Sequence, residues 1–294
     1  MHAHDGSDRP PPGRTGTGTG TGTGGGEGEG EGEGGYLLAN AETGAADRLA
    51  AIVEIFDPVT FRHLRATGIG PGWRCWEVGA GGTTVVTWLA EAVGPGGTVV
   101  ATDLDTSLLE PATGPNVDVL RHDVVRDQPP AGPFDLVHAR LVLVHVPHRR
   151  RALDAMAGAL KPGGWLVVED ADPALQPLAC PDVAGPDEEL ANKVRSAFRT
   201  LLARRGADLA YGRTLPRSLR EVGLVDVAAE GWFPLTHRRA ADLERATVTM
   251  LRSQLSESGL VDDEEIDCHL AAVAAGRLDL AQPPLITAWG RRPA

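Results

Sequence analysis

Several residues of the chain have the types and the spacing needed to bind a nucleotide-like ligand. Three glycines directly follow the apolar run 75–78: Gly79, Gly81 and Gly82. Glycine lets a backbone pass close to a ligand, and the helix expected next would add unpaired amides. Asp103 ends the following apolar run, where a carboxylate can accept two hydrogen bonds from a ribose diol. Asp123 ends a third run and is placed to accept from an exocyclic amine.

The spacing of the glycines separates two kinds of nucleotide site. A dinucleotide fingerprint has the pattern G-x-G-x-x-G. The sixth position counted from Gly79 is Thr84, so the sequence disfavours an NAD(P) site. Asp103 and Asp123 also have a plain structural alternative, as loop, turn or helix-cap residues.

A histidine and a pair of acids are candidates for contact with a second substrate. His145 lies just past the fourth expected strand, and histidine titrates near neutrality. It is therefore our candidate general base or acceptor-orienting group, with a histidine packed at the cofactor edge as the alternative. Glu169 and Asp170 end the fifth expected strand, where they could hold an amine or polarise a hydroxyl group. No histidine close in sequence makes a metal site specific, and a solvated acidic loop is the alternative.

Aromatic residues near the expected binding edge could line an apolar acceptor pocket. Tyr36 is our candidate for acceptor binding, together with Tyr211, Trp232 and Phe233, and packing in a lid core is the alternative for each. Within and after the fourth strand, we expect His138 in the core, Arg140 at the cofactor edge and His148 in solvent.

Short apolar runs and helical spacing predict the elements that carry these residues. Strands are expected at 75–78, 99–103, 117–120, 134–139 and 165–169. Helices are expected at 85–93 and 149–160, with a turn at Lys161-Pro162-Gly163-Gly164 before the fifth strand. Strands that alternate with helices favour an α/β fold with a doubly wound, mostly parallel sheet.

The flanking segments differ in character from this alternating part. Residues 1–35 consist largely of Thr-Gly and Gly-Glu repeats and are expected to form a disordered tail. Residues 36–72 are expected to form N-terminal helices that cover the site, separated at Pro58. Further helices are expected at 187–206, 213–222, 240–257 and 262–275, and strands at 225–232 and 285–289. We expect lid insertions at about 171–212 and 234–283 within a main domain of residues 73–294.

Composition limits the partners and the compartment of the protein. A formal charge of −12 lacks the basic surface that nucleic acids need. Three cysteines without a CxxC pair support neither a disulfide framework nor a zinc site. No apolar run approaches the roughly 20 residues of a membrane span, and the N-terminus lacks a secretory signal pattern. We expect a cytoplasmic protein, monomeric or homodimeric, without a resident metal.

Five motifs in register within residues 73–170 resemble those of the class I S-adenosylmethionine-dependent methyltransferases. Residues 77–82, Glu-Val-Gly-Ala-Gly-Gly, are similar to the first motif of that family, with Thr83 in place of its third glycine. Asp103 matches its ribose-binding acid, and Asp123 with Val124 its adenine-contacting acid. Residues 134–137 and 160–164 resemble its fourth-strand motif and the turn before its fifth strand. Residues 36–40, 141–147 and 288–292 are similar to the quinone-biosynthesis type and to small-molecule methyltransferases of actinobacterial pathways.

The resemblance implies a Rossmann-like sheet of seven strands whose last strand, 285–290, inserts antiparallel beneath a helical lid. It implies S-adenosylmethionine as the cofactor. The expected cofactor-binding residues are Glu77, Gly79, Ala80, Gly81, Asp103, Leu104, Asp123, Val124 and Arg140.

We predict methyl transfer to a small organic acceptor at oxygen, nitrogen or carbon, in secondary metabolism. An NAD(P)-dependent oxidoreductase and a non-methylating protein that keeps the cofactor fold are the alternatives.

Overall fold

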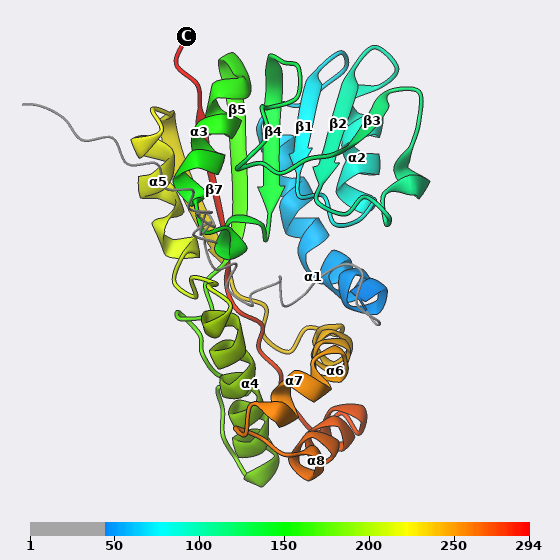
Figure 1. The fold of residues 1–294 in the computed structure, drawn as a ribbon, viewed down its shortest axis with the longest axis vertical. Helices are drawn as coiled ribbons and strands as arrows, with labels where there is room; N and C mark the ends of the chain where they lie inside the picture. The colour runs from blue at the N-terminus through cyan, green and yellow to red at the C-terminus, as the bar shows by residue number, and fades with distance from the viewer. Residues whose placement is uncertain (1–44) are drawn as a thin grey trace, which may run out of the picture. The chain divides into compact units, whose positions relative to one another are not determined.

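The computed structural model describes residues 45–294, which fold around one seven-stranded sheet (Figure 1). The strands are β1 (Arg74–Val78), β2 (Thr98–Asp103), β3 (Val117–Arg121), β4 (Phe134–Arg140), β5 (Leu160–Ala171), β6 (Val225–Trp232) and β7 (Leu285–Arg291). The helices are α1 (Ala45–Ala66), α2 (Thr84–Val93), α3 (Arg149–Ala159), α4 (Pro186–Arg204), α5 (Leu215–Glu221), α6 (Ala240–Met250), α7 (Arg252–Glu257) and α8 (Asp263–Ala274). Short 3-10 helices occur at η1 (Glu110–Ala112), η2 (Leu143–His145) and η3 (Gly212–Thr214). None of the helices within residues 45–294 is both long and apolar enough to cross a membrane.

The order of the strands confirms the expected doubly wound sheet. It runs β3-β2-β1-β4-β5-β7-β6. The pairs from β3 to β5 are parallel, whereas β7 is antiparallel to both of its neighbours. The chain moves outward from β1 to β2 and β3 on one side, and β4 begins the other side. Ligands of such sheets bind at the carboxyl ends of the strands where the order reverses.

Two hydrophobic clusters cover the two faces of the sheet. On one face, residues of α3 and α5 share a cluster with residues of the strands, which includes Met156, Leu219 and Val137. On the other face, α2 and the end of α1 cover the same strands, with Leu64 and Leu136 in one cluster. Leu136 and Val137 are neighbours in β4 and point to opposite faces. Both faces are therefore buried, which explains why these strands are continuous apolar runs rather than alternating ones.

The prediction that Pro58 separates two helices is wrong. α1 runs without interruption from Ala45 to Ala66, with Pro58 inside it. A proline removes one backbone hydrogen bond and costs about 3 kcal/mol or more in a helix interior. Pro58 itself is exposed, but Ile55, Phe56 and Val59 are all buried. Packing of this apolar face outweighs the missing hydrogen bond.

Four helices in the second half of the chain form a unit that we call the helical lobe: α4, α6, α7 and α8. They share a core that includes Val194, Val248 and Ile266, and Figure 1 shows the lobe beyond the carboxyl ends of the strands. Helix α1 joins it, because Ile52 and Leu243 lie in one cluster. The single helix expected over 240–257 is two helices in the structure, α6 and α7. Their junction is Leu251, where φ and ψ are −100° and 10°.

The turn expected at Lys161–Gly164 belongs to β5 in the structure. β5 starts at Leu160, and its register with β4 shifts between Phe134 and Leu136. The amide of Gly163 donates to the carbonyl of Arg292 at 2.9 Å, and Lys161 forms an ion pair with Asp135 of β4. These partners extend the strand through the segment that local sequence marks as a turn.

We expect Gly164→Ala to destabilise the protein by about 1–3 kcal/mol, the usual cost of overpacking. A Cβ atom at this position would lie 2.9 Å from the carbonyl oxygens of both Lys161 and Phe134. Backbone oxygens of a central sheet have little freedom to move aside. The free energy of unfolding, measured by urea denaturation, checks this expectation.

The matched control is Gly158→Ala in α3, where a Cβ meets no atom within 4 Å. Alanine is a better helix former than glycine, so this variant should gain about 0.5–1 kcal/mol. Equal unfolding free energies for the two variants would contradict the steric explanation.

Candidate functional site

The expected cofactor residues gather at one edge of the sheet. Strands β1, β2, β4 and β5 are parallel, so their carboxyl ends share that edge. The loop after β1, Asp103 at the end of β2 and the segment after β4 all lie at this edge, where the strand order reverses.

The loop after β1 requires glycine for its conformation and for its packing. Gly79 and Gly81 have φ values of 62° and 60°, in the left-handed region that other residues adopt only with strain. A Cβ at Gly79 would lie 2.5 Å from Cγ2 of Val142, so the loop packs directly against the segment after β4. At Gly82 a Cβ would meet no atom within 4 Å. The backbone next to Gly82 is therefore open to a ligand.

Helix α2 begins at the end of this loop without a side-chain cap. Thr83, at the N-cap position, makes no capping hydrogen bond. The first amides of a helix have no partners within the helix, and they carry the positive end of its dipole. The start of α2 can therefore donate hydrogen bonds to a polar ligand group.

Asp103 ties the end of β2 to the glycine loop. Its Oδ2 accepts from the amide of Gly81 at 2.9 Å, and its Oδ1 accepts from the amide of Asp105 at 3.1 Å. The amide of Ala80 donates to the carbonyl of Thr102 at 3.0 Å. A carboxylate offers about four lone pairs, so both oxygens of Asp103 can accept a further hydrogen bond. The position suits a ribose diol.

Three of the expected cofactor-binding residues, Asp123, Val124 and Leu104, have mixed placements. Oδ1 of Asp123 accepts from the amide of Val125 at 2.8 Å, which forms a turn after β3. Val124 is buried in the core, whereas Leu104 is 62% exposed. The turn that was the structural alternative for Asp123 is present, and its contact with a ligand stays a prediction.

Two residues expected at the cofactor have partners inside the protein. Glu77 is buried, and its Oε2 lies 2.6 Å from Nδ1 of His138. Nη1 of Arg140 donates to Asp57 at 2.8 Å and to Thr60 at 2.9 Å. Arg140 ends β4 at the edge where it was expected, and contact of Glu77 and Arg140 with the cofactor stays a prediction.

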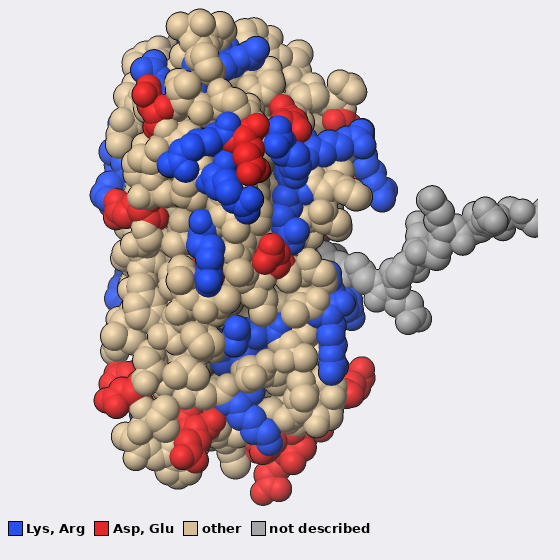
Figure 2. All heavy atoms as spheres, turned by 90° about the vertical axis from the view of Figure 1, so that its left-hand side faces the viewer, with Lys and Arg blue, Asp and Glu red and all other residues tan. Residues whose placement is uncertain are grey.

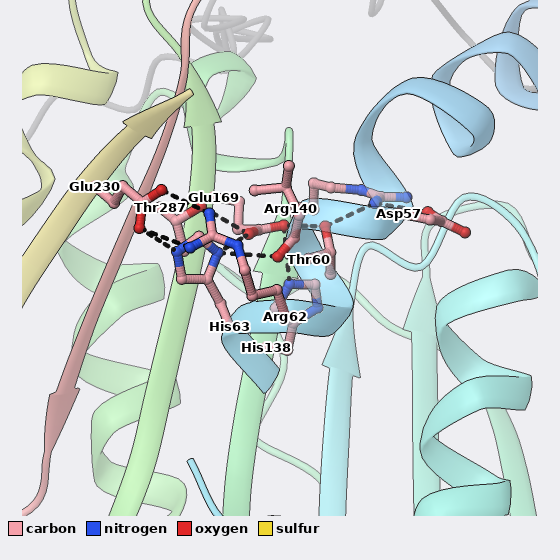
Figure 3. A network of polar contacts seen from close by, with 10 residues as sticks. Asp57, Thr60, Arg62, His63, His138, Arg140, Glu169, Glu230 and Thr287 are labelled. Carbon is pink, nitrogen blue, oxygen red and sulfur yellow. Dashed lines mark hydrogen bonds and ion pairs between the residues drawn. The ribbon is translucent and has the colours of Figure 1, made fainter. Parts of the chain in front are cut away.

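Figure 3 shows Arg140, Asp57 and Thr60 joined with other side chains in a polar network, with Glu169 at its centre. Glu169 accepts hydrogen bonds from Thr287 at 2.8 Å and from Thr60. Nε2 of His138 lies 3.6 Å from Oε2 of Glu169, so this histidine stands between two glutamates, Glu77 and Glu169. Five side chains of the network are almost completely buried: Thr60, Glu77, His138, Glu169 and Thr287. The network connects α1 to β1, β4, β5 and β7.

The network extends outward to β6 through His63. Its Nδ1 lies 3.7 Å from Glu169, and its Nε2 lies 3.4 Å from Glu230 of β6. Glu230 also forms an ion pair with Arg62 at 2.6 Å. Helix α1 is thereby fixed to strands on both sides of β5.

The charges within the network stabilise one another. Burial by itself would lower the pKa of His138, but Glu77 and Glu169 outweigh burial and raise it to about 9. Burial likewise disfavours an ionised Glu169, yet the hydrogen bond and charge of His138 lower its pKa to about 2. At neutral pH, His138 is therefore an imidazolium ion beside an ionised Glu169.

The acidic cluster predicted at the end of β5 is not exposed. The alternative of a solvated loop is wrong, because three acids there are fully buried: Glu169, Asp170 and Asp172. Oδ2 of Asp170 accepts from the amide of Leu143 at 3.1 Å, and Asp172 pairs with Arg213. Helix α1, η2 and η3 supply these partners, so the acids have structural contacts where acceptor contacts were expected for Glu169 and Asp170.

His145 belongs to η2, a segment held on two sides. Leu141 precedes it with a φ of 57°, which is a strained value for a residue other than glycine. Asp170 binds the amide of Leu143, and Nε of Arg149 donates to the carbonyl of Leu143 at 2.8 Å. The imidazole of His145, which is half-buried, is thus carried by a fixed backbone.

The protonation states around η2 are shifted in opposite directions. Burial, followed by the charges of Arg48 and Arg149, lowers the pKa of His145 to about 4. Burial raises the pKa of Asp170 to about 8, against hydrogen bonds from the amides of Val144 and Leu143. At neutral pH His145 is therefore uncharged, and Asp170 takes up a proton more readily than an exposed aspartate does. So low a pKa makes His145 a weak base, better suited to orienting an acceptor than to removing its proton.

The aromatic candidates separate into core and surface residues. Tyr211 is buried, with the guanidinium of Arg149 5.1 Å from the centre of its ring. Trp232 packs edge-on against Phe56 of α1, whereas Phe233 is 41% exposed. Tyr36 lies outside the described residues.

The two other histidine predictions are confirmed. His138 is fully buried in the sheet. His148 is exposed at the start of α3.

Sequence reasoning missed the polar residues of α1 and β7 that complete the network. Thr60 occurs at a four-residue spacing from the buried Phe56 and Leu64, on the apolar face of α1. A lone hydroxyl in such an apolar stripe signals a buried partner, because a buried polar group without a hydrogen bond is costly. That signal indicates a partner for Thr60 but does not identify Glu169.

Comparison with known proteins adds family information to this geometry. A family profile described as "Methyltransferase domain" matches residues 42–229. Methyltransferase str2 of Strobilurus tenacellus is 33% identical over 102 residues, which is 34% of this chain and 35% of that protein. Methyltransferase str3 of the same organism is 46% identical over 43 residues, 15% of this chain and 16% of that protein. The matches thus span about a third or less of the length of these relatives.

Solved structures with low sequence identity share the fold. Phosphoethanolamine N-methyltransferase 2 of Haemonchus contortus is 16% identical, with a TM-score of 0.54 over 86% of this chain and 58% of that chain. It was solved with S-adenosylmethionine in one structure, and with S-adenosylhomocysteine and phosphomonomethylethanolamine in another. A protein assigned as a methyltransferase of an antibiotic biosynthesis pathway in Anabaena variabilis is 15% identical, with a TM-score of 0.51 over 78% of this chain and 96% of that chain.

The raised pKa of His138 predicts how stability depends on pH. A group whose pKa is raised on folding contributes stability below its unfolded pKa, near 6.5, and loses it as pH rises through about 9. The shift corresponds to about 3 kcal/mol. We expect His138→Gln to be destabilised by about that amount at pH 6, and by much less at pH 9.5. Urea denaturation of both proteins at the two pH values measures the difference.

His148→Gln is the control, because His148 is exposed and should give a difference near zero at both pH values. A destabilisation of His138→Gln that stays constant between pH 6 and 9.5 would rule out the charged state of this histidine.

Proposed function

Because the chain belongs to the family of methyltransferase domains, we propose that it transfers a methyl group from S-adenosylmethionine to a small organic acceptor. The observation that carries the proposal is the hydrogen bond that the amide of Gly81 donates to Asp103. Both residues lie within the stretch that the family profile matches. It places a carboxylate with free lone pairs beside an open glycine loop. The complexes of the Haemonchus contortus enzyme with S-adenosylmethionine and S-adenosylhomocysteine support the choice of cofactor.

The residues at the strand ends fit this cofactor. Asp103 would accept hydrogen bonds from the ribose hydroxyls, and Asp123 would lie toward the adenine with Val124 and Leu104. The backbone from Gly79 to Gly82 would pass beside the amino-acid portion, where the start of α2 adds unpaired amides. Glu77 and Arg140 would support this site through neighbouring residues. Glu77 contacts His138, and Arg140 donates to Asp57 of α1.

When bound, S-adenosylmethionine supplies an electrophilic methyl group on a positively charged sulfur. The main task of the chain is then to hold the acceptor in line with that methyl and to exclude water. His145, neutral and fixed by η2, would orient the acceptor. We propose that segments 171–212 and 234–283 form the lid over the acceptor, together with α1, the described helix of segment 36–72.

The charge of the protein supports a small-molecule acceptor. The chain carries a formal charge of −12. On the face drawn in Figure 2, basic side chains gather with acidic ones among them. On α3 and α5, Arg150 pairs with Asp154 and Arg217 with Glu221. Paired charges leave a weaker field than the continuous basic surface of nucleic-acid-binding proteins.

The setting of the reaction is also part of the proposal. Cys75, Cys180 and Cys268 are all free thiols, which favours a reducing compartment such as the cytoplasm. The antibiotic-pathway assignment of the Anabaena variabilis protein supports a role in secondary metabolism.

Calorimetric titration tests the cofactor, and methyl transfer tests the reaction. We expect S-adenosylmethionine and S-adenosylhomocysteine to bind and NADH not to bind. Transfer of a labelled methyl group should then be detected with at least one member of a panel of phenols, amines and carboxylic acids. Binding of NADH without either sulfur nucleoside would refute the proposal. Tight cofactor binding without transfer to any acceptor would favour a non-methylating protein of the same fold.

The proposed role of Asp103 makes a separate prediction. Asp103→Ala should weaken the binding of S-adenosylhomocysteine by about 1–3 kcal/mol, because the ribose loses a polar partner and Gly81 loses its tie to β2. Asp118→Ala, at an exposed position of β3, should bind with unchanged affinity. An unchanged affinity for Asp103→Ala would show that the ribose lies elsewhere.

A further inference from the structure

Three arginines begin α3, a position that local electrostatics disfavours. They are Arg149, Arg150 and Arg151, and the first turn of this helix contains no acid. The first turn of a helix carries positive partial charge, so cations are unfavourable there. A residue placed against a local preference needs a compensating contact elsewhere. Arg150 finds one in Asp154 of the same helix, at 3.0 Å, whereas the partners of Arg149 lie outside α3.

Arg149 contacts three segments other than its own helix. In η2, its Nε donates to the carbonyl of Leu143 at 2.8 Å, and its Nη2 to that of Val144 at 3.1 Å. Nη2 also donates to the carbonyl of Gly206, just after α4, at 3.4 Å. The guanidinium carbon lies 5.1 Å from the ring centre of Tyr211, which precedes η3. A guanidinium can make these contacts together, because it offers five N–H donors and a flat face.

The other side of η2 is held by β5. The fully buried Asp170 accepts a hydrogen bond from the amide of Leu143 at 3.1 Å. The amide of Asp208, in the connection between α4 and η3, donates to the carbonyl of Val144 at 3.1 Å. The backbone of η2 thus lies between an acid that binds an amide and an arginine that binds carbonyls. Arg149 joins this backbone to the connection that follows α4.

Arg149 acts on His145 through both geometry and charge. His145 is the last residue of η2, and its amide donates to the carbonyl of Val142 at 3.1 Å. The carbonyls that Arg149 binds belong to the two residues before His145, so they set where the imidazole begins. Burial and the charges of Arg48 and Arg149 lower the pKa of His145. A neutral imidazole can accept a hydrogen bond from a hydroxyl or amine, which an imidazolium cannot do.

We propose that Arg149 is a positioning residue of the methyl transfer, which places η2 and the imidazole of His145 for contact with the acceptor. The inference rests on the proposed function, because it assigns a further residue to that reaction. Arg149 acts through η2 rather than by touching a substrate. Its forked hydrogen bonds fix the backbone, and its charge favours the neutral imidazole that can accept from the acceptor.

Two substitutions separate the geometry of Arg149 from its charge. Arg149→Lys keeps the positive charge but replaces the fork with a single ammonium group. Arg149→Met removes both and keeps an unbranched side chain. Both variants should fold, since each η2 carbonyl that Arg149 binds keeps a backbone donor, the amide of Val146 or of Asp208. Arg150→Met is the matched control, at the next and exposed position of α3.

Hydrogen exchange measured by mass spectrometry reports on η2 in the full chain, with and without S-adenosylhomocysteine. Segment 141–147 should exchange about tenfold faster in both Arg149 variants, because each loses the forked contacts. It should exchange at the wild-type rate in Arg150→Met, and segment 134–140 of β4 should be unchanged in all variants. Equal exchange of segment 141–147 in all four proteins would overturn the proposal.

The imidazole of His145 gives a signature that a general loss of stability would not produce. In an NMR titration of labelled histidine, Arg149→Met should raise the pKa of His145, because one of the two cations near it is gone. Arg149→Lys and Arg150→Met should leave this pKa low. The same pKa in Arg149→Met and Arg149→Lys would contradict the assigned role of the charge.

The rate of methyl transfer tests the positioning role directly. With an acceptor from the panel, both Arg149 variants should lower kcat about tenfold, because the acceptor loses its alignment. Their affinity for S-adenosylhomocysteine should equal that of the wild type. An unchanged kcat would refute the positioning role. Failure of the wild type to bind S-adenosylhomocysteine would instead refute the proposed function, while the exchange rates would still test the contacts of Arg149.

Discussion

The charge of His138, held between Glu77 and Glu169, is the interaction on which the rest of the binding edge depends. The three residues belong to β1, β4 and β5, so their attraction helps to align the carboxyl ends of the three strands. Each partner alone would be costly in the core, because a buried charge without a counter-charge is strongly destabilising. Thr60 and Thr287 satisfy the remaining oxygens of Glu169, which brings α1 and β7 to the same place. This buried polar network therefore determines how α1 and β7 are placed against the central strands, whose other contacts are mostly apolar.

The geometry at the carboxyl edge follows from these fixed strand ends. Once β1 and β4 are aligned, Val142 lies so close to Gly79 that a side chain there is excluded. The strained backbone of Leu141 then turns into η2, which Asp170 and Arg149 hold. The glycine loop and η2 thus share one support. Preorganisation of this kind suits a reaction that depends on alignment more than on acid or base chemistry.

Local sequence patterns predict the elements well, because apolar runs and helical spacing reflect burial directly. The boundaries of β4 and α2 are therefore close to the predicted ones. The same patterns do not predict the partners of buried polar residues. Glu77 and His138 are 61 positions apart and meet only because β1 and β4 are neighbours. Glu169 likewise meets Thr60 and Thr287 only because α1 and β7 lie beside β5. Pro58 failed as a helix break for the same reason, since tertiary packing outweighed a local preference.

Pro58 acquires a different meaning from its place in α1. Before it, Phe56 packs in one cluster with Leu243 of α6 and edge-on against Trp232 of β6, so the first half of the helix contacts both the lobe and the sheet. After it, Thr60 and His63 are tied to Glu169, so the second half belongs to the sheet. Between the two halves one backbone hydrogen bond is missing, which makes this the most compliant joint of the helix.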